Sequence, residues 1–481
     1  MKTKNILYIL IFFVIFSLPS CTEDFEEINT NPNDPEVVPS NLLLGGILRS
    51  TANEVQDTFL AGESPLCWVQ QISKPQYNDG DLYKPRKGSI QFLWDVLYGS
   101  VIKDAQKMYD IAEEEGNQKI QGVSLVMQAY AFQLLTDAFG DIPFSEVGLG
   151  DQGNFTPVYE SQQTVYEGII NMLTQASSLL EGSGEIDSSQ DLLYAGDSSL
   201  WSKFANSLKF RAIMRISEAP GFSVGSSLQA LVTEGNMFTS NDDEAKLVYL
   251  SSDPNANPYY ERLILGGPAR EEEWCVGENL VKMMNGLELG VFDNRLPVYA
   301  LPAKDGEYTG LPAGLSSNPT EDFAKPLSKI GTFYTMAEAP ACFMSYAQLE
   351  FLMAEAAEKK LISGGSTSAG THYANGIIAS FSANGADLGG YPTDYYGGST
   401  GLKQIAQQSY IALFMQAYEA WAEYRRTGVP DLTPAPAGVI SQIPSRLQYP
   451  TDEQSDNKVN YDAAVSNQGA DLLTTPIWWM K

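Results

Sequence analysis

Apolar side chains recur three or four positions apart along much of the chain, which is the spacing of one buried helix face. Two such runs, residues 89–115 and 118–139, are separated by the short helix-breaking sequence Gly116-Asn117. Ser89 is placed to cap the first helix, and Gly140 is placed to end the second. The pattern predicts two long helices joined by a tight turn, an αα-hairpin.

The same reasoning predicts further helices, few strands and long irregular connections. The helices expected are 199–217, 345–361, a shorter one near 372–381, and 402–426. The best strand signal covers residues 245–250. Loops rich in Gly, Pro and aromatic residues are expected at 71–88, 251–277, 296–335 and 384–401. We therefore predict a mostly helical, all-α fold whose rigid body carries loops suited to binding.

The hairpin at 89–139 partly fits a tetratricopeptide repeat. Ala131, Leu135, Ala138 and Pro143 match the second-helix spacing of small, large and small residues followed by proline. The first helix lacks the corresponding Trp, Leu, Gly and Tyr set. A tetratricopeptide-like hairpin is therefore indicated, while the number of such repeats stays open.

The last long helix ends in a group of charged residues. Glu423 and Arg426 are three positions apart, and Glu419 and Glu423 are four apart, so these side chains are neighbours on the helix surface. We expect Glu419, Glu423, Arg425 and Arg426 to form a buried ion network that docks the helix, in preference to binding a ligand. Arg446 is expected to act as a second clamp of this kind.

The amino-terminal residues have the pattern of an export signal. Lys2 and Lys4 precede an apolar run at residues 6–18, which is shorter than the roughly 20 residues of a membrane-spanning helix. Leu18-Pro19-Ser20-Cys21 resembles a bacterial lipobox, which implies cleavage before Cys21, a diacylglycerol on its sulfur and an acyl chain such as palmitate on its amino group. The alternative is an ordinary signal peptide with a chance cysteine nearby.

The segments on either side of Cys21 set the domain prediction. Residues 1–20 are expected to be the lipoprotein signal peptide. Residues 21–40 combine the acylated cysteine with acids, Asn and prolines, which predicts a flexible tether. Residues 41–481 are left for the folded body, whose hydrophobic content of 43% and aromatic content of 11% indicate a substantial core.

Charge and cysteine content exclude several classes of partner and cofactor. The formal net charge of −29 argues against nucleic acid and anionic lipid as binding partners. Cys67, Cys275 and Cys342 are odd in number and match no zinc spacing, so we expect buried thiols, with pairing left open. The single histidine, His372, excludes a multi-histidine metal site and is expected at a surface or cap. No cofactor is predicted.

A glycosidase is the main enzymatic alternative, because it needs only two suitably placed carboxylates. Glu271-Glu272-Glu273-Trp274 is the most suggestive cluster, since acids stand beside an aromatic residue. Adjacent side chains project in different directions, however, and set no separation between two carboxylates. We therefore expect binding and not catalysis.

Five blocks, together with the lipobox, resemble the SusD/RagB family of Bacteroidetes outer-membrane lipoproteins. They are AYAFQLLTDAFGDIPFSEV from Ala129, WSKFANSLKFRAIMRIS from Trp201, YAQLEFLMAEAAEKK from Tyr346, YEAWAEYRRTGVPDL from Tyr418 and IPSRLQYPTDEQSDN from Ile443, continued by the terminal PIWWMK. They follow the family's order over nearly the whole chain. The acids after Cys21 also resemble the surface-export signal of such lipoproteins.

The resemblance implies a fold and a function that periodicity does not show. Residues 41–481 would form one SusD-like domain of tetratricopeptide-like hairpins whose loops make the ligand face. The protein would be lipid-anchored on the outer membrane, facing the exterior, as a lid over a TonB-dependent SusC-like barrel. It would capture an oligosaccharide, or a peptide as in some branches, and would not be an enzyme. A periplasmic protein-binding scaffold is the remaining alternative.

Aromatic residues outside the helical faces are the candidate ligand contacts, because sugar rings stack their C–H faces on Trp and Tyr. The candidates are Trp68, Tyr77, Tyr83, Tyr259, Tyr260, Trp274 and Tyr334. Core packing is the structural alternative for each of them. For Trp68 in particular, the neighbours Leu66 and Val69 favour the core.

Overall fold

The longest helix, α6 (Gln118–Phe139), lies at the centre of the helical body. Every residue from Ile120 to Phe139 is buried, because α3, α5, α7, α8 and α18 all pack against this helix. The Asn117 side chain starts α6 by accepting a hydrogen bond from the Ile120 N–H at 3.2 Å, and Gly140, with φ of 87°, ends it. The helix predicted at 118–139 is confirmed.

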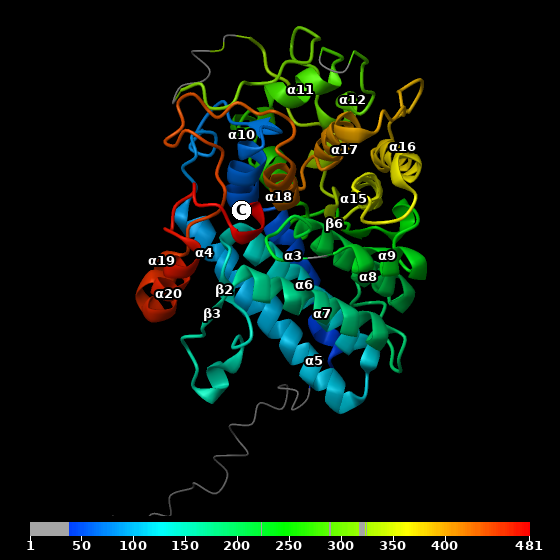
Figure 1. Cartoon of the computed structure of the whole chain (residues 1–481). Coiled ribbons are helices and arrows are strands. Elements are labelled where there is room, and N and C mark those ends of the chain that lie inside the picture. The colour runs from blue at the N-terminus through cyan, green and yellow to red at the C-terminus, as the bar shows by residue number, and fades with distance from the viewer. Residues whose placement is uncertain (1–37, 223, 288–289, 317–322, 324) are drawn as a thin grey trace, which may run out of the picture. The chain divides into compact units, whose positions relative to one another are not determined.

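The computed structural model describes residues 38–222, 224–287, 290–316, 323 and 325–481 (Figure 1). Within them, Ser40–Lys481 forms one compact unit. The predicted signal peptide, Cys21 and nearly all of the tether lie outside the described residues. The other α-helices are α3 (Asn41–Val55), α4 (Lys87–Val96), α5 (Lys103–Glu115), α7 (Gln162–Leu180), α8 (Ser198–Arg215), α9 (Gly225–Glu234), α10 (Pro268–Glu271), α11 (Glu278–Met284), α12 (Leu296–Tyr299), α14 (Thr332–Thr335), α15 (Tyr346–Glu358), α16 (Gly365–Ala383), α17 (Gly398–Ala412), α18 (Ala417–Thr427), α19 (Thr451–Asp456) and α20 (Lys458–Gln468).

Successive helices pack as neighbours, which is the arrangement of helical hairpins. Helices α5, α6, α7 and α8 pack in chain order in the lower part of Figure 1, and α15 packs against α16 and α17 in the upper part. Irregular segments gather with α10, α11 and α12 at the top of the same view. The predicted mostly helical architecture with long loops is confirmed.

Three short antiparallel pairs are the β-structure of the described residues. They are β1 (Ile72–Ser73) with β5 (Cys275–Val276), β2 (Ile142–Pro143) with β3 (Tyr159–Glu160), and β4 (Ala245–Leu247) with β6 (Ala341–Met344). The strand expected at 245–250 is therefore present but shorter. The β1–β5 and β4–β6 pairs join segments distant in sequence, whereas β2 and β3 flank one short connection.

Two helix predictions differ from the structure. One misses a break between two helices, and the other places the amino-terminal cap wrongly. The expected helix 402–426 is two helices, because the chain turns between α17 and α18 at Met415, whose φ is +63°. The expected helix 89–115 contains a π-helical stretch, η2 (Leu97–Ile102), between α4 and α5. Helix α4 begins at Lys87, two residues before Ser89, and Arg86 takes the cap position. The prediction that Ser89 caps this helix was therefore wrong.

The remaining helix predictions agree except for length. Helix α8 matches 199–217, and α15 matches 345–361, with the Ser345 hydroxyl accepting a hydrogen bond from the Gln348 N–H at 3.2 Å. Helix α16 starts seven residues before the expected His372. The long loop at 251–277 contains the π-helical η5 (Tyr260–Leu265). Outside the long loops lie the π-helical η1 (Thr58–Leu66) and the 3-10 turns η3 (Leu149–Gln152), η4 (Asn241–Asp243) and η6 (Trp478–Met480).

The ion network expected at the end of α18 is confirmed for Glu419, Glu423 and Arg426, whereas Arg425 hydrogen-bonds to backbone carbonyl oxygens. Arg426 pairs with Glu423, at 2.7 Å, and with Glu355 of α15. Glu419 pairs with Arg215 of α8. Arg425 donates to the carbonyl oxygens of Asp137 and Ser445 at 2.7 and 2.8 Å, so all these charges dock α18 onto its neighbours. Arg446 pairs with Asp471 at 3.1 Å, as the predicted clamp requires.

The described cysteines are free thiols. Cys67 and Cys275 are buried, as expected, and Cys342 is half-buried. Burial raises the pKa of all three thiols. Separately, no helix in the described part of the chain combines the length and the apolar character needed to cross a bilayer.

Candidate functional site

The seven candidate aromatics fall into three groups by exposure. Tyr77 is 69% exposed. Tyr260 and Tyr334 are half-buried. Trp68, Tyr83, Tyr259 and Trp274 are at most 2% exposed. The structure therefore does not bring the seven together on one surface, and each remains a prediction as a ligand contact.

The buried members have partners inside the protein. Trp68 donates to the Gly80 carbonyl oxygen at 3.2 Å, and its ring meets that of Trp421 edge to face, with centroids 5.0 Å apart. The Tyr83 hydroxyl accepts a hydrogen bond from the Ala435 N–H at 2.7 Å. Core packing, the structural alternative, accounts for the burial of these two side chains.

A buried ion cluster holds Trp274 in place. The Lys74 ammonium pairs with Glu63 and, at 3.4 Å, with Glu273, and it lies 4.4 Å from the centroid of a Trp274 ring. Arg262 reaches Glu273 at 2.7 Å. Burial would raise the pKa of Glu273, but the charges of Arg262 and Lys74 hold it below its usual range. Glu273, one of the three acids considered for a glycosidase, thus serves as an internal counter-ion.

The loops between residues 251 and 338 enclose a concave site of about 410 Å³, here called the loop pocket. Its lining contains two of the candidate aromatics, Tyr260 and Trp274. The other lining residues are Ser251, Leu263, Ile264, Glu271, Leu301, Lys329, Ile330, Thr332, Thr335, Met336, Ala337 and Glu338. Binding sites for small ligands have this size and a mostly apolar lining with a few polar groups.

The loop pocket also has polar groups in its lining, and apart from the buried Thr335 they lie on exposed or half-buried positions. Glu271 and Lys329 form an ion pair at 3.2 Å, and both line the pocket with Glu338. Tyr260 comes from η5, whereas Trp274 directly precedes β5, which pairs with β1. The pocket thus combines an aromatic and aliphatic lining with a charged pair, an arrangement that can bury one face of a neutral sugar and hydrogen-bond its hydroxyl groups.

Tyr334 and Tyr77 lie away from the loop pocket lining. Tyr334 packs edge to face against Phe414, with ring centroids 4.9 Å apart, and its hydroxyl donates to the Asn384 Oδ1 at 2.5 Å. Tyr77 projects from the 71–88 loop with φ of +53°, a backbone conformation that side chains other than glycine rarely adopt. Both stay predictions as ligand contacts.

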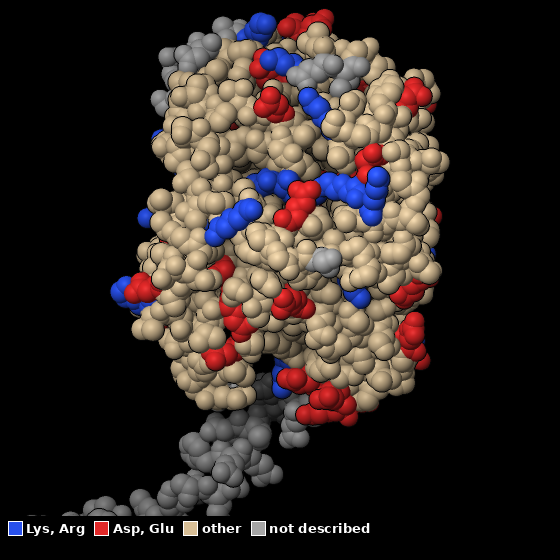
Figure 2. All heavy atoms as spheres, viewed as in Figure 1, with Lys and Arg blue, Asp and Glu red and all other residues tan. Residues whose placement is uncertain are grey.

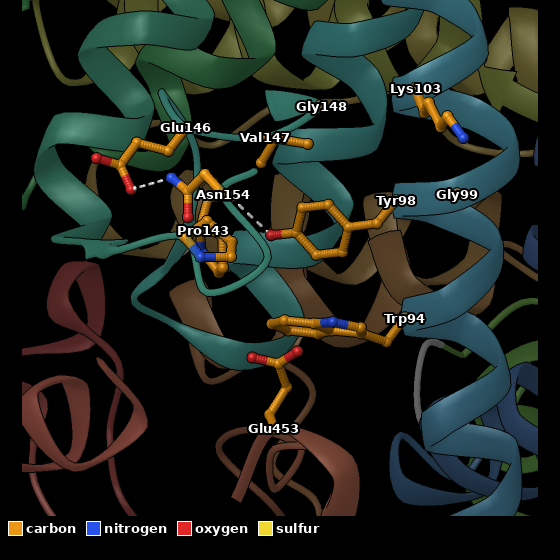
Figure 3. Close-up of a pocket in the computed structure, with 11 residues that line it drawn as sticks. Trp94, Tyr98, Gly99, Lys103, Pro143, Glu146, Val147, Gly148, Asn154 and Glu453 are labelled. Carbon is orange, nitrogen blue, oxygen red and sulfur yellow. Dashed lines mark hydrogen bonds between the residues drawn. The ribbon is translucent and has the colours of Figure 1, made fainter. Parts of the chain in front are cut away.

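A second cavity, of about 250 Å³, was not predicted (Figure 3). It lies between α4 and η2 on one side and the segment that connects β2 to β3 on the other. Trp94, Tyr98, Glu146 and Glu453 are among its lining residues, and we call it the aromatic cleft. Trp94 belongs to the apolar run that predicted the helix at 89–115. The spacing of four residues between Trp94 and Tyr98 is the signal in the sequence that could have indicated the cleft.

Groups associated with metal or nucleophilic chemistry are sparse in the described part of the chain. It contains no set of three or more His, Cys, Asp or Glu side chains that could hold a metal ion. His372 is half-buried, and its Nδ1 lies 2.8 Å from the Glu350 Oε2. This pair joins α16 to α15, so the single histidine has a structural partner.

A helical body that presents a mostly apolar pocket on irregular loops has the architecture expected of a ligand-binding protein. The chain matches a SusD-like family described as "Starch-binding associating with outer membrane" over residues 32–450, and it belongs to that family. The match confirms the resemblance found in the sequence blocks. Membership supports a nutrient-binding role in association with the outer membrane.

Solved structures share the fold of this chain. The chain is similar to a chitin-binding protein at 25% identity, with a TM-score of 0.76 over 91% of this chain and 99% of the other. A chitin-binding SusD homologue from Flavobacterium johnsoniae shares the fold at 24% identity and a TM-score of 0.78, over 91% and 98% of the two chains. A SusD homologue from Bacteroides uniformis does so at 22% identity and 0.78, over 91% and 99%. Comparison with curated proteins finds no match.

Proposed function

We propose that this chain is a cell-surface lipoprotein that captures an oligosaccharide in the loop pocket and passes it to a TonB-dependent SusC-like transporter. The observation that carries the proposal is the loop pocket itself, a mostly apolar site with Tyr260 and Trp274 in its lining, on a member of a family described as starch-binding. Two chitin-binding proteins of the same fold support a glycan as the ligand.

The proposal includes the anchor predicted from the sequence. Residues 1–20 would direct export, Cys21 would carry the lipid, and residues 22–40 would hold the body 41–481 away from the membrane on the outside of the cell. Acyl chains bind a bilayer in proportion to the apolar surface they bury, and two or more chains give stable attachment.

We expect the substitution Cys21→Ser to shift most of the protein from the membrane fraction to the soluble fraction, because it removes the sulfur that receives the diacylglycerol. Fractionation of cells and mass spectrometry of the amino-terminal peptide measure the effect. Cys342→Ser is the matched control and should leave the protein in the membrane. A C21S variant that remains membrane-bound would contradict the anchor.

Catalysis is not part of the proposal. Glu273 is held by Lys74 and Arg262, and Glu271 is paired with Lys329, so two acids of the suggestive cluster already have counter-ions. A ligand that is bound for import is recognised by stacking and hydrogen bonds and needs no nucleophile. The protein is thus proposed to bind and release its ligand unchanged.

Peptide capture is the second candidate, and one observation favours it. The net charge of −29 would steer cationic peptides toward the protein. Electrostatic steering depends on ionic strength, whereas stacking of a neutral glycan does not. An association rate that falls steeply with salt would favour a peptide ligand, and a salt-independent rate would favour a glycan.

We expect Tyr260→Ala to weaken oligosaccharide binding by about tenfold, which corresponds to about 1.4 kcal/mol. The half-buried ring would no longer offer a surface for stacking, while the fold should change little. Titration calorimetry with a panel of starch and chitin oligosaccharides measures the affinity, and thermal unfolding checks the fold.

Tyr396→Ala provides the matched control, because Tyr396 is 74% exposed and is absent from the loop pocket lining. It should bind the same oligosaccharide with unchanged affinity. Equal losses in both variants, or no loss in Y260A, would remove the loop pocket as the capture site. A loss in Tyr77→Ala alone would move the site to the 71–88 loop.

A further inference from the structure

The aromatic cleft is a built cavity formed by three separate segments of the chain. Trp94 projects from α4 and Tyr98 from η2, facing the connection between β2 and β3 that carries Glu146 and Asn154 (Figure 3). Glu453, from α19, closes one side with its carboxylate close to the Trp94 ring. Figure 2 shows the surface hollowed between the β2–β3 connection and α5, with acidic side chains on either side of the hollow.

The aromatic wall of the cleft is rigid. Trp94 is 5% exposed, and its ring packs against those of Tyr98 and Phe139, with centroids 4.8 and 5.1 Å away. Tyr159 lies nearly parallel to Trp94 at 6.2 Å. Rings held in this way can receive a cation without a further loss of side-chain freedom.

Glu453 has only neutral hydrogen-bond partners among the described residues. Its Oε2 accepts from the Tyr159 hydroxyl at 2.6 Å and from the Asn457 amide at 3.4 Å. Burial raises the pKa of Glu453, because these donors replace the lost water incompletely. In contrast, the buried carboxylates of Glu355 and Glu273 each meet at least one Arg or Lys.

Glu146 is a second carboxylate in the cleft lining without an ion-pair partner in the described part of the chain. Its Oε2 accepts hydrogen bonds from the Val158 N–H and from the Asn154 side chain, both at 3.0 Å. These bonds hold the pKa of Glu146 below its usual range, so the group is ionised at neutral pH. The β2–β3 connection therefore supplies a fixed negative charge opposite the aromatic wall.

The other charged residue of the lining, Lys103, stands apart from Glu453. Lys103 is exposed on α5, and Figure 3 shows its ammonium group beyond Tyr98, on the side away from Glu453. An anionic ligand would have to approach Glu453 and Glu146, and a wholly apolar ligand would leave the Glu453 carboxylate without a counter-ion. A positively charged ligand is attracted by Glu146 and Glu453 and gives Glu453 a counter-ion. The net charge of −29 also favours its approach.

We propose that the aromatic cleft binds an organic ammonium group, with Glu453 as its counter-ion and the Trp94 and Tyr98 rings beside it. A cation is attracted to the carboxylate by charge and to the negative face of an aromatic ring by the ring quadrupole, and both attractions grow where water is excluded. The group can be carried by an amino sugar or by a lysine side chain. This site is separate from the loop pocket and does not depend on the function proposed there.

The test compares probes that carry a charged amine with counterparts in which the amine is acetylated and neutral. The purified full-length chain is titrated with a glucosamine tetramer and its N-acetylated counterpart, and with trilysine and its side-chain-acetylated counterpart. We expect the amine form of at least one pair to bind at least tenfold more tightly than its acetylated form. Binding by the sugar alone, by the peptide alone or by both identifies the source of the ammonium group.

Glu453→Gln tests the residue while keeping an oxygen that can accept from Tyr159. We expect E453Q to weaken binding of the amine probe about tenfold and to leave the acetylated probe unaffected. Asp456→Asn is the control, because it removes the same charge from the same short helix outside the cleft lining. Equal effects of E453Q and D456N would show general charge attraction and would overturn the proposal, as would equal binding of amine and acetylated probes.

Discussion

Replacing Arg215 by alanine should lower the free energy of unfolding by about 3–5 kcal/mol, the range for removing one partner of a buried ion pair. The Arg215 side chain is 1% exposed and ends α8. It pairs with Glu419 of α18, and its guanidinium reaches Asp137 of α6 at 3.4 Å and Glu423 at 3.9 Å. Three helices that are distant in sequence therefore meet at one cation.

The cost arises from the carboxylates that the substitution leaves behind. Burial would raise the pKa of Glu419, but Arg215 and Arg211 hold it below its usual range. Without Arg215, the Glu419 charge loses its nearest cation in a place where water cannot replace it. Chemical denaturation near pH 7 measures the loss.

Two further variants separate this explanation from a general loss of packing. Adding Glu419→Gln to R215A should recover part of the stability, because it removes the uncompensated charge. Lys458→Ala, which breaks the exposed Lys458–Asp462 pair, should change stability by no more than about 1 kcal/mol. If R215A behaved like K458A, the network would not stabilise the fold.

Sequence periodicity predicted the helices whose ends are marked by local chemistry. Helix α6 has Asn117 and Gly140 at its ends, and α18 ends at Gly428, whose φ is +67°. Such caps act through neighbouring residues, so they can be recognised in the sequence. The Glu423–Arg426 pair of α18 was also predictable, because residues three apart are neighbours on any helix, whereas the partners Arg215 and Glu355 come from other helices.

The break between α17 and α18 could not be predicted in the same way. Leu413, Phe414 and Met415 are all buried, so the apolar pattern continues through the turn. Met415 takes a left-handed backbone conformation within the buried core, and no glycine or proline marks it. Local pattern cannot show a turn that tertiary contacts impose.

The sequence predicted only part of the candidate site, because a local pattern does not show which aromatic residues the tertiary fold buries. Tyr260 and Trp274 were selected as aromatics in a loop, and both line the loop pocket. Trp68 was selected by the same rule but packs against Trp421, more than 300 positions along the chain. The aromatic cleft was missed because Glu453 reaches Trp94 only through the tertiary fold.

The stability of this protein should fall as pH rises from about 4.5 to 8, in part because of one buried acid, Glu54. Glu54 lies near the end of α3 and is 4% exposed. Burial, with a smaller contribution from the Asp57 charge, raises the pKa of Glu54 from 4.5 to about 8. No Lys, Arg or His of the described residues forms an ion pair with it.

The direction of this pH dependence follows from the number of protons that the folded and the unfolded states bind. Between about pH 4.5 and 8 the folded protein keeps the Glu54 proton that the unfolded chain has released, so each rise in pH favours the unfolded chain. Below this window Glu54 is neutral in both states and costs nothing. Above it the full penalty applies, and a pKa difference of this size corresponds to roughly 4–5 kcal/mol.

Glu54→Gln should therefore be close to neutral in stability at pH 4.5 and more stable than the unmodified protein by roughly 4–5 kcal/mol at pH 9. Glutamine keeps the shape of the side chain but cannot ionise, so the gain should grow across the same window. Denaturation curves of both proteins at several pH values measure it. Glu113→Gln, at an exposed acid of α5, is the control and should follow the unmodified protein at every pH. A gain for E54Q that is the same at pH 4.5 and 9 would show that Glu54 does not carry its proton in the folded state.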